Sequence, residues 1–397
     1  MGIEWMTSAV REIPPSGIRE FFESNPGGRD VIQLGVGEPD FVTPEAVRAA
    51  CIRALQEGKT KYTPNSGLPE LREAIAGYLA DSFRLPYDPA GEILVTVGSS
   101  EAVDLALRTL VSPGDEVLIP APSYIAYSPI ARLHGGRIVE IPSTAEQGFK
   151  LTAEELKRHL TPRSKVLVVN YPSNPTGAVM TEEDWLPIAE LAIAHDLVVI
   201  SDEVYAELTY EGRHYSIARV PGMKERTIVI NGFSKAFAMT GWRIGYACGD
   251  RNLIAGMLKI HQYTMMCAPI LGQIAALESL RGDGLKAKDE MKAEFARRRK
   301  LFVNGLNDLG LDCHMPQGAF YAYPSIAHTG LSSDEFARRL LQEEGVATVP
   351  GHVFGPGGEG RIRCSYAASA EMLSEALRRM GRFVEKIAGG RAYAATS

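Results

Sequence analysis

Lys165-Val-Leu-Val-Val-Asn-Tyr-Pro-Ser-Asn-Pro-Thr-Gly177 joins a run of apolar residues to a turn rich in proline and glycine. The run lacks the alternation of a half-buried strand, which predicts a strand that is buried on both faces. The two prolines and the glycine end this strand and fix the backbone of the turn. A strand of this kind is typical of a parallel sheet that helices cover on both sides.

The same pattern recurs on both sides of this stretch. Short β-branched runs predict further strands at Glu92–Val97, Glu116–Pro120, Arg137–Ile141, Leu197–Ser201, Arg226–Ile230 and Arg243–Cys248. Helical patterns lie between many of them. Thr43 and Pro44 are expected to open one helix that Gly58 closes, and Thr152 with Glu155 predicts a capping box for another. This alternation predicts an α/β fold with a mostly parallel seven-stranded sheet.

The pattern changes after about residue 260. A charge-rich helical stretch, Leu285–Leu309, leads to Ala319–Pro324 and then to further short strands and helices, which indicates a smaller α+β domain. We expect an N-terminal segment, residues 1–40, that packs on both domains. A large domain would span residues 41–280, and a small C-terminal domain residues 281–397. A chain of 397 residues suits this division.

Composition narrows the class of protein. The net charge of -6 argues against general nucleic-acid binding, which needs a basic surface. The five cysteines form no CxxC pair, and the eight histidines form no cluster with metal-ligand spacing. The N-terminus does not have the pattern of a signal peptide, and no apolar run approaches the ~18 residues that span a bilayer. We therefore expect a cytoplasmic protein without a membrane segment or a built-in metal.

One stretch carries reactive chemistry, Gly232-Phe-Ser-Lys-Ala-Phe-Ala-Met-Thr-Gly-Trp-Arg-Ile-Gly245. Lys235 sits in a loop of small residues directly after a predicted buried strand. A second cation nearby, Arg243, would lower the proton affinity of the lysine amine and make it a nucleophile toward an aldehyde. The alternative is a solvated Lys235 in a surface loop and an ordinary ion pair at Arg243.

This stretch resembles the cofactor-lysine signature of the class I and II aminotransferases, which are fold-type I pyridoxal-phosphate enzymes. The resemblance extends from about Ser16 to about Phe383, with the motifs in the family's order. It implies that Lys235 bonds covalently to pyridoxal 5'-phosphate and later moves the proton of the substrate Cα. It also implies that Arg243 binds the cofactor phosphate, with Ser234 in reach.

Two further polar groups follow predicted strands, where ligands bind in parallel sheets. Asn174 lies in the rigid turn described above and could instead only stabilise that turn. Asp202 ends the next strand, where a buried carboxylate needs a partner, although it could instead cap a helix. The resemblance implies that Asp202 bonds the pyridine nitrogen, while Asn174 and Tyr205 share the phenolic oxygen of the cofactor.

Gly98-Ser-Ser-Glu-Ala102 opens a predicted helix, whose free N–H groups could bind an anion. Ser99 or Ser100 could instead act only as a helix cap. The resemblance places the phosphate here. It also implies that Tyr124 stacks on the cofactor ring, although core packing is the commoner role of an aromatic.

Two arginines near the end of the chain are candidates for binding the substrate. Arg361 and Arg363 would share one face of a strand, so periodicity cannot choose between them. The resemblance chooses Arg363 as the clamp for the substrate α-carboxylate and adds Gly37 beside it, where a simple turn glycine is the alternative. It also places Asn174 and Tyr124 near the substrate.

The resemblance further implies a homodimer in which Tyr62 reaches the phosphate site of the neighbouring subunit. The expected reaction is amino transfer between an L-amino acid and a 2-oxo acid, most often 2-oxoglutarate. A C–S lyase or a decarboxylase on the same fold is an alternative. A ligand-sensing transcription regulator would need a DNA-binding domain in front, and the pattern beginning by Ser16 leaves no room for one.

The donor is expected to be bulky, either aromatic or of the N-acetyl-diaminopimelate type. Two stretches, Ser16-Gly-Ile-Arg19 and Lys259-Ile-His-Gln-Tyr263, resemble the subgroup of the family that contains N-acetyl-diaminopimelate and aromatic aminotransferases. An apolar lining of the pocket is expected from Ile18, Tyr62, Tyr124 and Tyr263. Aspartate aminotransferase is the alternative. No lysine or arginine lies between Gly98 and Leu107 to bind a distal carboxylate. Arg19 could replace that cation, although no sequence pattern directs Arg19 toward the site.

Overall fold

The computed structural model describes residues 3–24 and 30–394. Its main sheet has seven strands in the order β2-β8-β7-β6-β5-β3-β4. β8 is antiparallel to both of its neighbours, and the other pairs are parallel. The strands are β2 (Ile93–Thr96), β3 (Glu116–Ala121), β4 (Arg137–Pro142), β5 (Ser164–Asn170), β6 (Val198–Asp202), β7 (Thr227–Gly232) and β8 (Gly245–Cys248). The predicted fold class is confirmed.

Helices cover both faces of this sheet, as the apolar runs predicted. Val166 and Val168 of β5 pack in one core cluster, which includes residues of α5 and α9. Leu167 and Val169 pack in a different cluster with residues of α7 and α8. These helices are α5 (Gly98–Leu110), α7 (Ala153–His159), α8 (Glu182–Ala194) and α9 (Arg251–Thr264).

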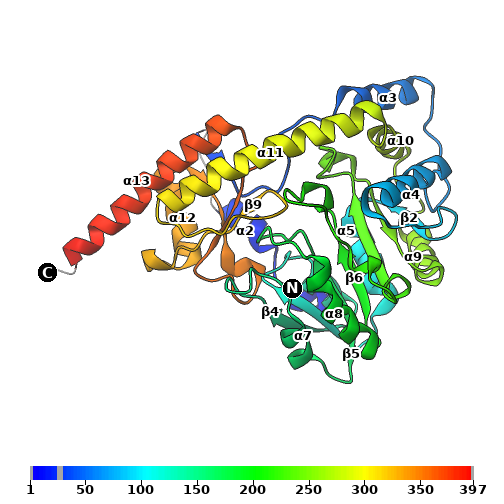
Figure 1. The fold of residues 1–397 in the computed structure, drawn as a ribbon, viewed down its shortest axis with the longest axis horizontal. Coiled ribbons are helices and arrows are strands. Elements are labelled where there is room, and N and C mark those ends of the chain that lie inside the picture. The colour runs from blue at the N-terminus through cyan, green and yellow to red at the C-terminus, as the bar shows by residue number, and fades with distance from the viewer. Residues whose placement is uncertain (1–2, 25–29, 395–397) are drawn as a thin grey trace.

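A second core lies beyond the sheet, among short strands and long helices. Its buried aromatic side chains include Phe295, Phe302, Phe320, Phe336 and Phe383. The elements around it are β9 (Tyr321–Ala322), β10 (Val346–Ala347), β11 (Val349–Pro350), β12 (Ile362–Ser365), α11 (Gly282–Asp308), α12 (Ser333–Glu344) and α13 (Ala370–Ala394). Figure 1 shows α11 running from the side of the sheet to α13, so this helix joins the two cores.

The N-terminal segment crosses between these parts. It contains α1 (Ser8–Glu12), α2 (Gly17–Ser24) and β1 (Ile32–Gln33). β1 pairs in parallel with β10, and Leu34 is buried in the second core. Ile18 instead packs against a cluster built on the main sheet. Residues 35–40 follow directly, so the start of this loop is held by the β1–β10 pair and by the buried Leu34.

The remaining helices cover the outside of the molecule. They are α3 (Glu45–Gln56), α4 (Pro69–Phe83), α6 (Tyr127–Leu133) and α10 (Ile270–Ser279). The predicted end of α3 at Gly58 is confirmed by a left-handed φ of 72°. The predicted cap at Thr43 is wrong, because its hydroxyl donates to Ala238 O at 2.6 Å instead. At Thr152 the structure shows the bond from Glu155 N–H to the Thr152 hydroxyl at 3.2 Å.

Candidate active site

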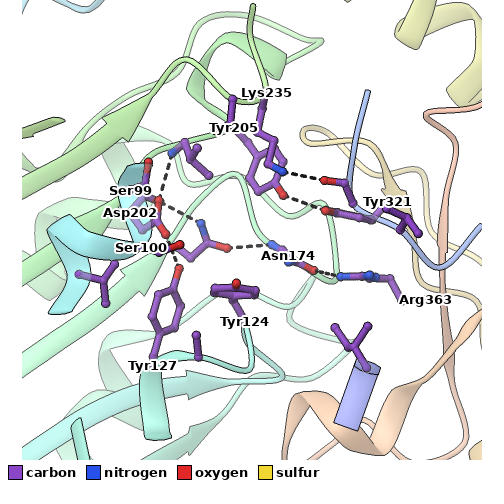
Figure 2. Close-up of a pocket in the computed structure, with 18 of the residues that line it drawn as sticks. Ser99, Ser100, Tyr124, Tyr127, Asn174, Asp202, Tyr205, Lys235, Tyr321 and Arg363 are labelled. Atoms are coloured by element: carbon purple, nitrogen blue, oxygen red, sulfur yellow. Dashed lines mark hydrogen bonds between the residues drawn. The ribbon is translucent and has the colours of Figure 1, made fainter. Parts of the chain in front are cut away.

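A cavity of about 540 Å³ lies at the carboxyl ends of the parallel strands. Residues from both cores and from the N-terminal segment line it. Eleven of the residues predicted to bind cofactor or substrate are on its wall, namely Gly37, Ser99, Ser100, Tyr124, Asn174, Asp202, Tyr205, Ser234, Lys235, Arg243 and Arg363. Figure 2 shows Asp202 and Arg363 on opposite sides of the cavity, with Tyr124 and Asn174 between them.

Lys235 enters the cavity from the loop that follows β7. Its Nζ donates to Gly37 O at 2.6 Å. Burial lowers the pKa of Lys235 to about 8; Glu38 opposes this shift, and the nearby Arg363 and Arg243 reinforce it. The side chain is therefore a confined amine with a readily lost proton, and not the solvated lysine of the alternative interpretation.

Glycines explain why this loop can lie so close to α5. A Cβ added at Gly232 would lie 2.8 Å from Ser99 Oγ and 3.1 Å from Gly245 Cα. A Cβ at Gly245 would meet the backbone of Ser99 and Gly98. Both positions must lack a side chain for β7, β8 and the first turn of α5 to meet. The small residues that frame Lys235 in the sequence therefore bring it beside a helix N-terminus.

Asp202 lies at the end of β6, on the side of the cavity opposite Arg363 (Figure 2). Its Oδ2 accepts from the Tyr127 hydroxyl at 2.6 Å, and its Oδ1 accepts from Val204 N at 3.2 Å. Burial raises the pKa of Asp202 to about 6. No helix begins at Asp202, since the next helical turn has Tyr205 as its N-cap. A cationic N–H group would stabilise this buried carboxylate.

Arg363 and Asn174 are joined across the cavity. Arg363 Nη1 donates to Asn174 Oδ1 at 2.8 Å, and Nη2 donates to Gly35 O at 2.7 Å. The guanidinium carbon lies 4.4 Å from the ring centre of Tyr321 and 4.9 Å from that of Phe354. Arg363 Nε is buried without a partner among the described residues. The fork is thus rigidly held and has unused hydrogen-bonding capacity.

Arg361 lies outside this cavity although it is two residues away. Its Nη1 donates to Tyr323 O at 3.1 Å, and its guanidinium lies 5.0 Å from the Phe149 ring centre. Arg361 therefore stacks farther along the same strand pair, on Tyr323, while Arg363 stacks on Tyr321. Arg361 lies just before β12 and Arg363 within it, so the position along the chain, and not the face of the strand, separates the two arginines.

Tyr321 is a cavity residue that sequence reasoning missed. Its hydroxyl bonds the Tyr205 hydroxyl at 2.8 Å (Figure 2). A Cβ on Gly37 would lie 3.3 Å from Tyr321 Cζ and closer still to the hydroxyl oxygen. Gly37 is therefore required by a close approach, and not by a turn. No sequence signal separated Tyr321 from the other aromatic residues of the second core.

The first turn of α5 has the features of an anion-binding site. Gly98 has a left-handed φ of 74°, and a Cβ on it would lie 3.0 Å from the guanidinium carbon of Arg243. Ser99 Oγ donates to Asn231 O at 3.0 Å, which orients the turn. The free N–H groups of α5 and the exposed Arg243 together provide positive charge on this side of the cavity.

Two tyrosines form the floor between these groups. The ring centres of Tyr124 and Tyr127 lie 5.5 Å apart in an edge-to-face contact. Tyr124 comes from the loop after β3, whereas the fully buried Tyr127 begins α6. Sequence reasoning gave Tyr127 no role, because only the fold brings its hydroxyl to Asp202.

Two predicted aromatic residues lie away from this cavity. Tyr62 is 81% exposed and Tyr263 is 87% exposed, and neither lines its wall. Ile18 and Arg19 of α2, by contrast, both line it. The sequence left open whether Arg19 reaches the site, and the structure places it on the cavity wall. The N-terminal segment folds back over the sheet, and this carries Arg19 to the cavity.

The donor set fits one class of ligand. A buried carboxylate suits a basic ring nitrogen, a confined lysine amine suits an aldehyde, and a helix N-terminus beside an arginine suits a phosphate. Pyridoxal 5'-phosphate carries all three groups. Among the described residues, no three His, Cys, Asp or Glu side chains are grouped so as to hold a metal ion. Across residues 3–24 and 30–394, no helix is long and apolar enough to span a membrane.

Comparison with known proteins matches residues 29–380 to the family described as aminotransferase class I and II. An aspartate aminotransferase of Pyrococcus abyssi is 46% identical, with 96% of this chain and 98% of that protein aligned. A Bacillus subtilis protein named as a probable N-acetyl-LL-diaminopimelate aminotransferase is 45% identical, with 95% of each aligned. The crystal structure of an aromatic aminotransferase from Pyrococcus horikoshii is 45% identical, with a TM-score of 0.88 over 93% of this chain and 99% of that one.

Proposed function

Because the chain belongs to the class I and II aminotransferases and is an enzyme that transfers amino groups between amino acids and 2-oxo acids, we propose which of its side chains carry out that chemistry. The single observation that carries the proposal is the cavity itself. It brings together Lys235 from the loop after β7, Asp202 from the end of β6 and Arg363 from β12.

Pyridoxal 5'-phosphate is the proposed cofactor, held by residues of the cavity wall. Lys235 forms the covalent bond, Asp202 pairs with the ring nitrogen, and Tyr124 covers the ring. Asn174 and Tyr205 donate to the phenolic oxygen. The phosphate is bound by Ser99, Ser100, Ser234 and Arg243, with Tyr62 of a second subunit. When bound, the cofactor supplies an electron sink for the electron pair that is left at the substrate Cα.

Lys235 is also the base that moves the Cα proton. Lowering the amine pKa from 10.5 to about 8 raises its neutral fraction at pH 7 by roughly 300-fold. A neutral amine can take a proton, and an amine whose pKa lies near the working pH can also return it. The bond to Gly37 O holds Nζ at the cavity wall when it is not otherwise engaged.

Asp202 keeps the ring nitrogen protonated. Its two oxygens already accept from Tyr127 and Val204, so the carboxylate is fixed in orientation before any ligand binds. A positively charged N–H against Asp202 would offset the cost of burying this charge. By holding a proton on that nitrogen, Asp202 would support the electron-sink chemistry that the cofactor supplies.

Arg363 binds the substrate α-carboxylate. Its guanidinium is planar and stacks on Tyr321, which fixes the plane in which a carboxylate can be held. The bonds to Asn174 and Gly35 are made to an amide and a carbonyl, and neither neutralises the charge of the arginine. All amino acids and 2-oxo acids share the α-carboxylate, so this contact serves both halves of the reaction.

We propose a bulky donor, aromatic or of the N-acetyl-diaminopimelate type, with 2-oxoglutarate as the acceptor. The apolar wall at Ile18, Val36 and Tyr124 supports this. Aspartate is a second candidate donor, because relatives named for aspartate are equally similar and Arg19 also faces the cavity. The two donor classes differ in the charge of the side chain that this wall must accept.

A homodimer is the proposed assembly. Tyr62, Tyr263, Met265 and Met266 present large apolar side chains to the surface, which favours a protein interface there. We also propose the division into an N-terminal segment (1–40), a large domain (41–280) and a small domain (281–397). The separate core around α11 and α13 supports this division.

Reduction with borohydride tests the assignment of Lys235. Purified enzyme is expected to be yellow, and borohydride should bleach the colour and leave the cofactor on the peptide that contains Lys235. Lys235→Ala protein should retain no covalent cofactor after the same treatment. An adduct mapped to another lysine would show that Lys235 is not the cofactor lysine.

A further inference from the structure

Helix α2 is fixed in place over the mouth of the cavity. A Cβ on Gly17 would lie 3.0 Å from Val353 Cγ1, so the start of α2 lies directly on the turn before Gly355. Phe21 is buried with Ala337 and neighbouring apolar residues, and Ile18 packs on the core of the main sheet. With both apolar contacts made, Arg19 has a defined position, and it lines the cavity.

The charges on the cavity wall are unbalanced. Four of the described lining residues are cationic, Arg19, Lys235, Arg243 and Arg363, while Asp202 is the single carboxylate among them. The proposed function assigns a bound group to each of these cations except Arg19, for which it notes only that the side chain faces the cavity. Lys235 and Arg243 contact the cofactor, and Arg363 binds the substrate α-carboxylate.

Arg19 has no hydrogen bond or ion pair with any described residue, and its side chain is exposed. Ile18, which lines the same wall, adds apolar surface beside it. A free guanidinium at the mouth of a cavity, facing an apolar wall, suits the far end of a substrate that carries its reacting carbon deeper inside. A carboxylate matches the two parallel N–H groups of the fork.

We propose that Arg19 binds the second carboxylate of dicarboxylic substrates. These are 2-oxo diacids of about five carbons and the amino acids that correspond to them. This inference rests on the proposed function, in which Arg363 already holds the α-carboxylate. The exposure of Arg19 also explains how one site serves neutral donors. When an apolar side chain occupies the cavity, Arg19 remains hydrated and no buried charge is left unpaired.

A comparison of acceptors tests the proposal. Arg19→Gln removes the charge, and Arg11→Gln removes the same charge from the neighbouring exposed helix α1, outside the cavity. The acceptors are 2-oxoglutarate and 2-oxohexanoate, a monocarboxylic 2-oxo acid of similar length. Arg19→Gln should lower kcat/KM for 2-oxoglutarate by about tenfold to a hundredfold, as loss of a charged hydrogen-bond pair does. It should change the value for 2-oxohexanoate by less than about twofold.

Equal losses with both acceptors, or no loss with either, would overturn the proposal. Arg11→Gln should match the wild type with both acceptors, and a loss there as large as in Arg19→Gln would assign the effect to general charge. Arg19→Lys should fall between the wild type and Arg19→Gln, because an ammonium keeps the charge without the fork. If the wild type used 2-oxohexanoate and not 2-oxoglutarate, transamination would stand and the role of Arg19 would be refuted.

Direct binding separates this inference from the proposed function. Calorimetric titration with glutarate and with pentanoate requires no catalysis. Wild-type enzyme should bind glutarate more tightly than pentanoate. Arg19→Gln should reduce this difference in affinity by about tenfold or more. Arg363→Lys should weaken both ligands. A glutarate preference that survives in Arg19→Gln would place the second carboxylate elsewhere, whatever the activity of the enzyme.

Discussion

Replacing Arg363 with lysine should weaken the binding of every substrate of this enzyme. The arginine makes two hydrogen bonds, to Asn174 Oδ1 at 2.8 Å and to Gly35 O at 2.7 Å, and it stacks on Tyr321 at 4.4 Å. A lysine ammonium cannot make both bonds in one plane, and it lacks the flat surface that stacks on the ring. The substitution keeps the positive charge but removes the planar pair of hydrogen-bond donors.

The size of the effect follows from the bond that is lost. A hydrogen bond to a charged group contributes about 1.5–3 kcal/mol. Since about 1.4 kcal/mol corresponds to a factor of ten, kcat/KM should fall by roughly 10- to 150-fold. The factor should be similar for donors and acceptors, because each presents the same α-carboxylate to Arg363.

Steady-state kinetics with phenylalanine, aspartate and 2-oxoglutarate measure this, after the cofactor spectrum has shown equal loading. Arg361→Lys is the matched control, since it makes the same change two residues away, where the side chain stacks on Phe149 outside the cavity. A loss confined to one substrate would assign Arg363 to side-chain recognition. An equal loss in Arg361→Lys would show that the effect is structural.

Three further changes should each give a distinct result. Asp202→Ala should load cofactor but lose roughly 10²–10³ in rate, because the ring nitrogen loses its charge partner; near-wild-type turnover would show that Asp202 has no electrostatic role. In cofactor-free enzyme, the rate at which Lys235 captures pyridoxal phosphate should rise with pH and reach half its maximum near pH 8, since the neutral amine reacts and burial lowers its pKa to that value; a midpoint near 10.5 would show a solvated lysine. Gly98→Ala should weaken cofactor affinity by about tenfold, because its left-handed backbone costs about 1–2 kcal/mol with a side chain and the Cβ meets Arg243; Gly77→Ala, in open space on α4, should leave affinity unchanged.

Local patterns were sufficient to predict the sheet and its order of elements. Apolar runs such as Lys165–Asn170 and Leu197–Ser201 require burial on both faces wherever they lie, so each could be assigned without knowing its neighbours. The strand predicted from Arg243 begins two residues later, at Gly245, because Arg243 has a left-handed φ of 56° that no strand adopts. Helix caps were predicted less well from local sequence. The Thr43 hydroxyl donates to the distant carbonyl of Ala238 and does not cap its own helix.

The chemistry of Lys235, Asp202 and Arg363 was also predicted from the sequence, through the family that these motifs resemble. What the motifs could not give was the set of contacts that tune each group. Lys235 bonds a carbonyl 198 residues away, and Arg363 bonds an amide 189 residues away. Such partners leave no periodicity in the chain, because their spacing in sequence is set by the connections between elements and not by the site.

Tyr127, Tyr321 and Arg19 belong to the site for this same reason. The hydroxyl of Tyr127 meets Asp202 because α6 begins beside β6, and Tyr321 meets Gly37 because β9 and the N-terminal loop converge. Arg19 joins them because Ile18 and Phe21 anchor α2 to two different cores. The sequence determines which residues are apolar, reactive or rigid over short distances. Which of these residues share a cavity is decided only by the packing of distant segments. Burying apolar surface lowers the free energy whatever the separation of the two segments along the chain.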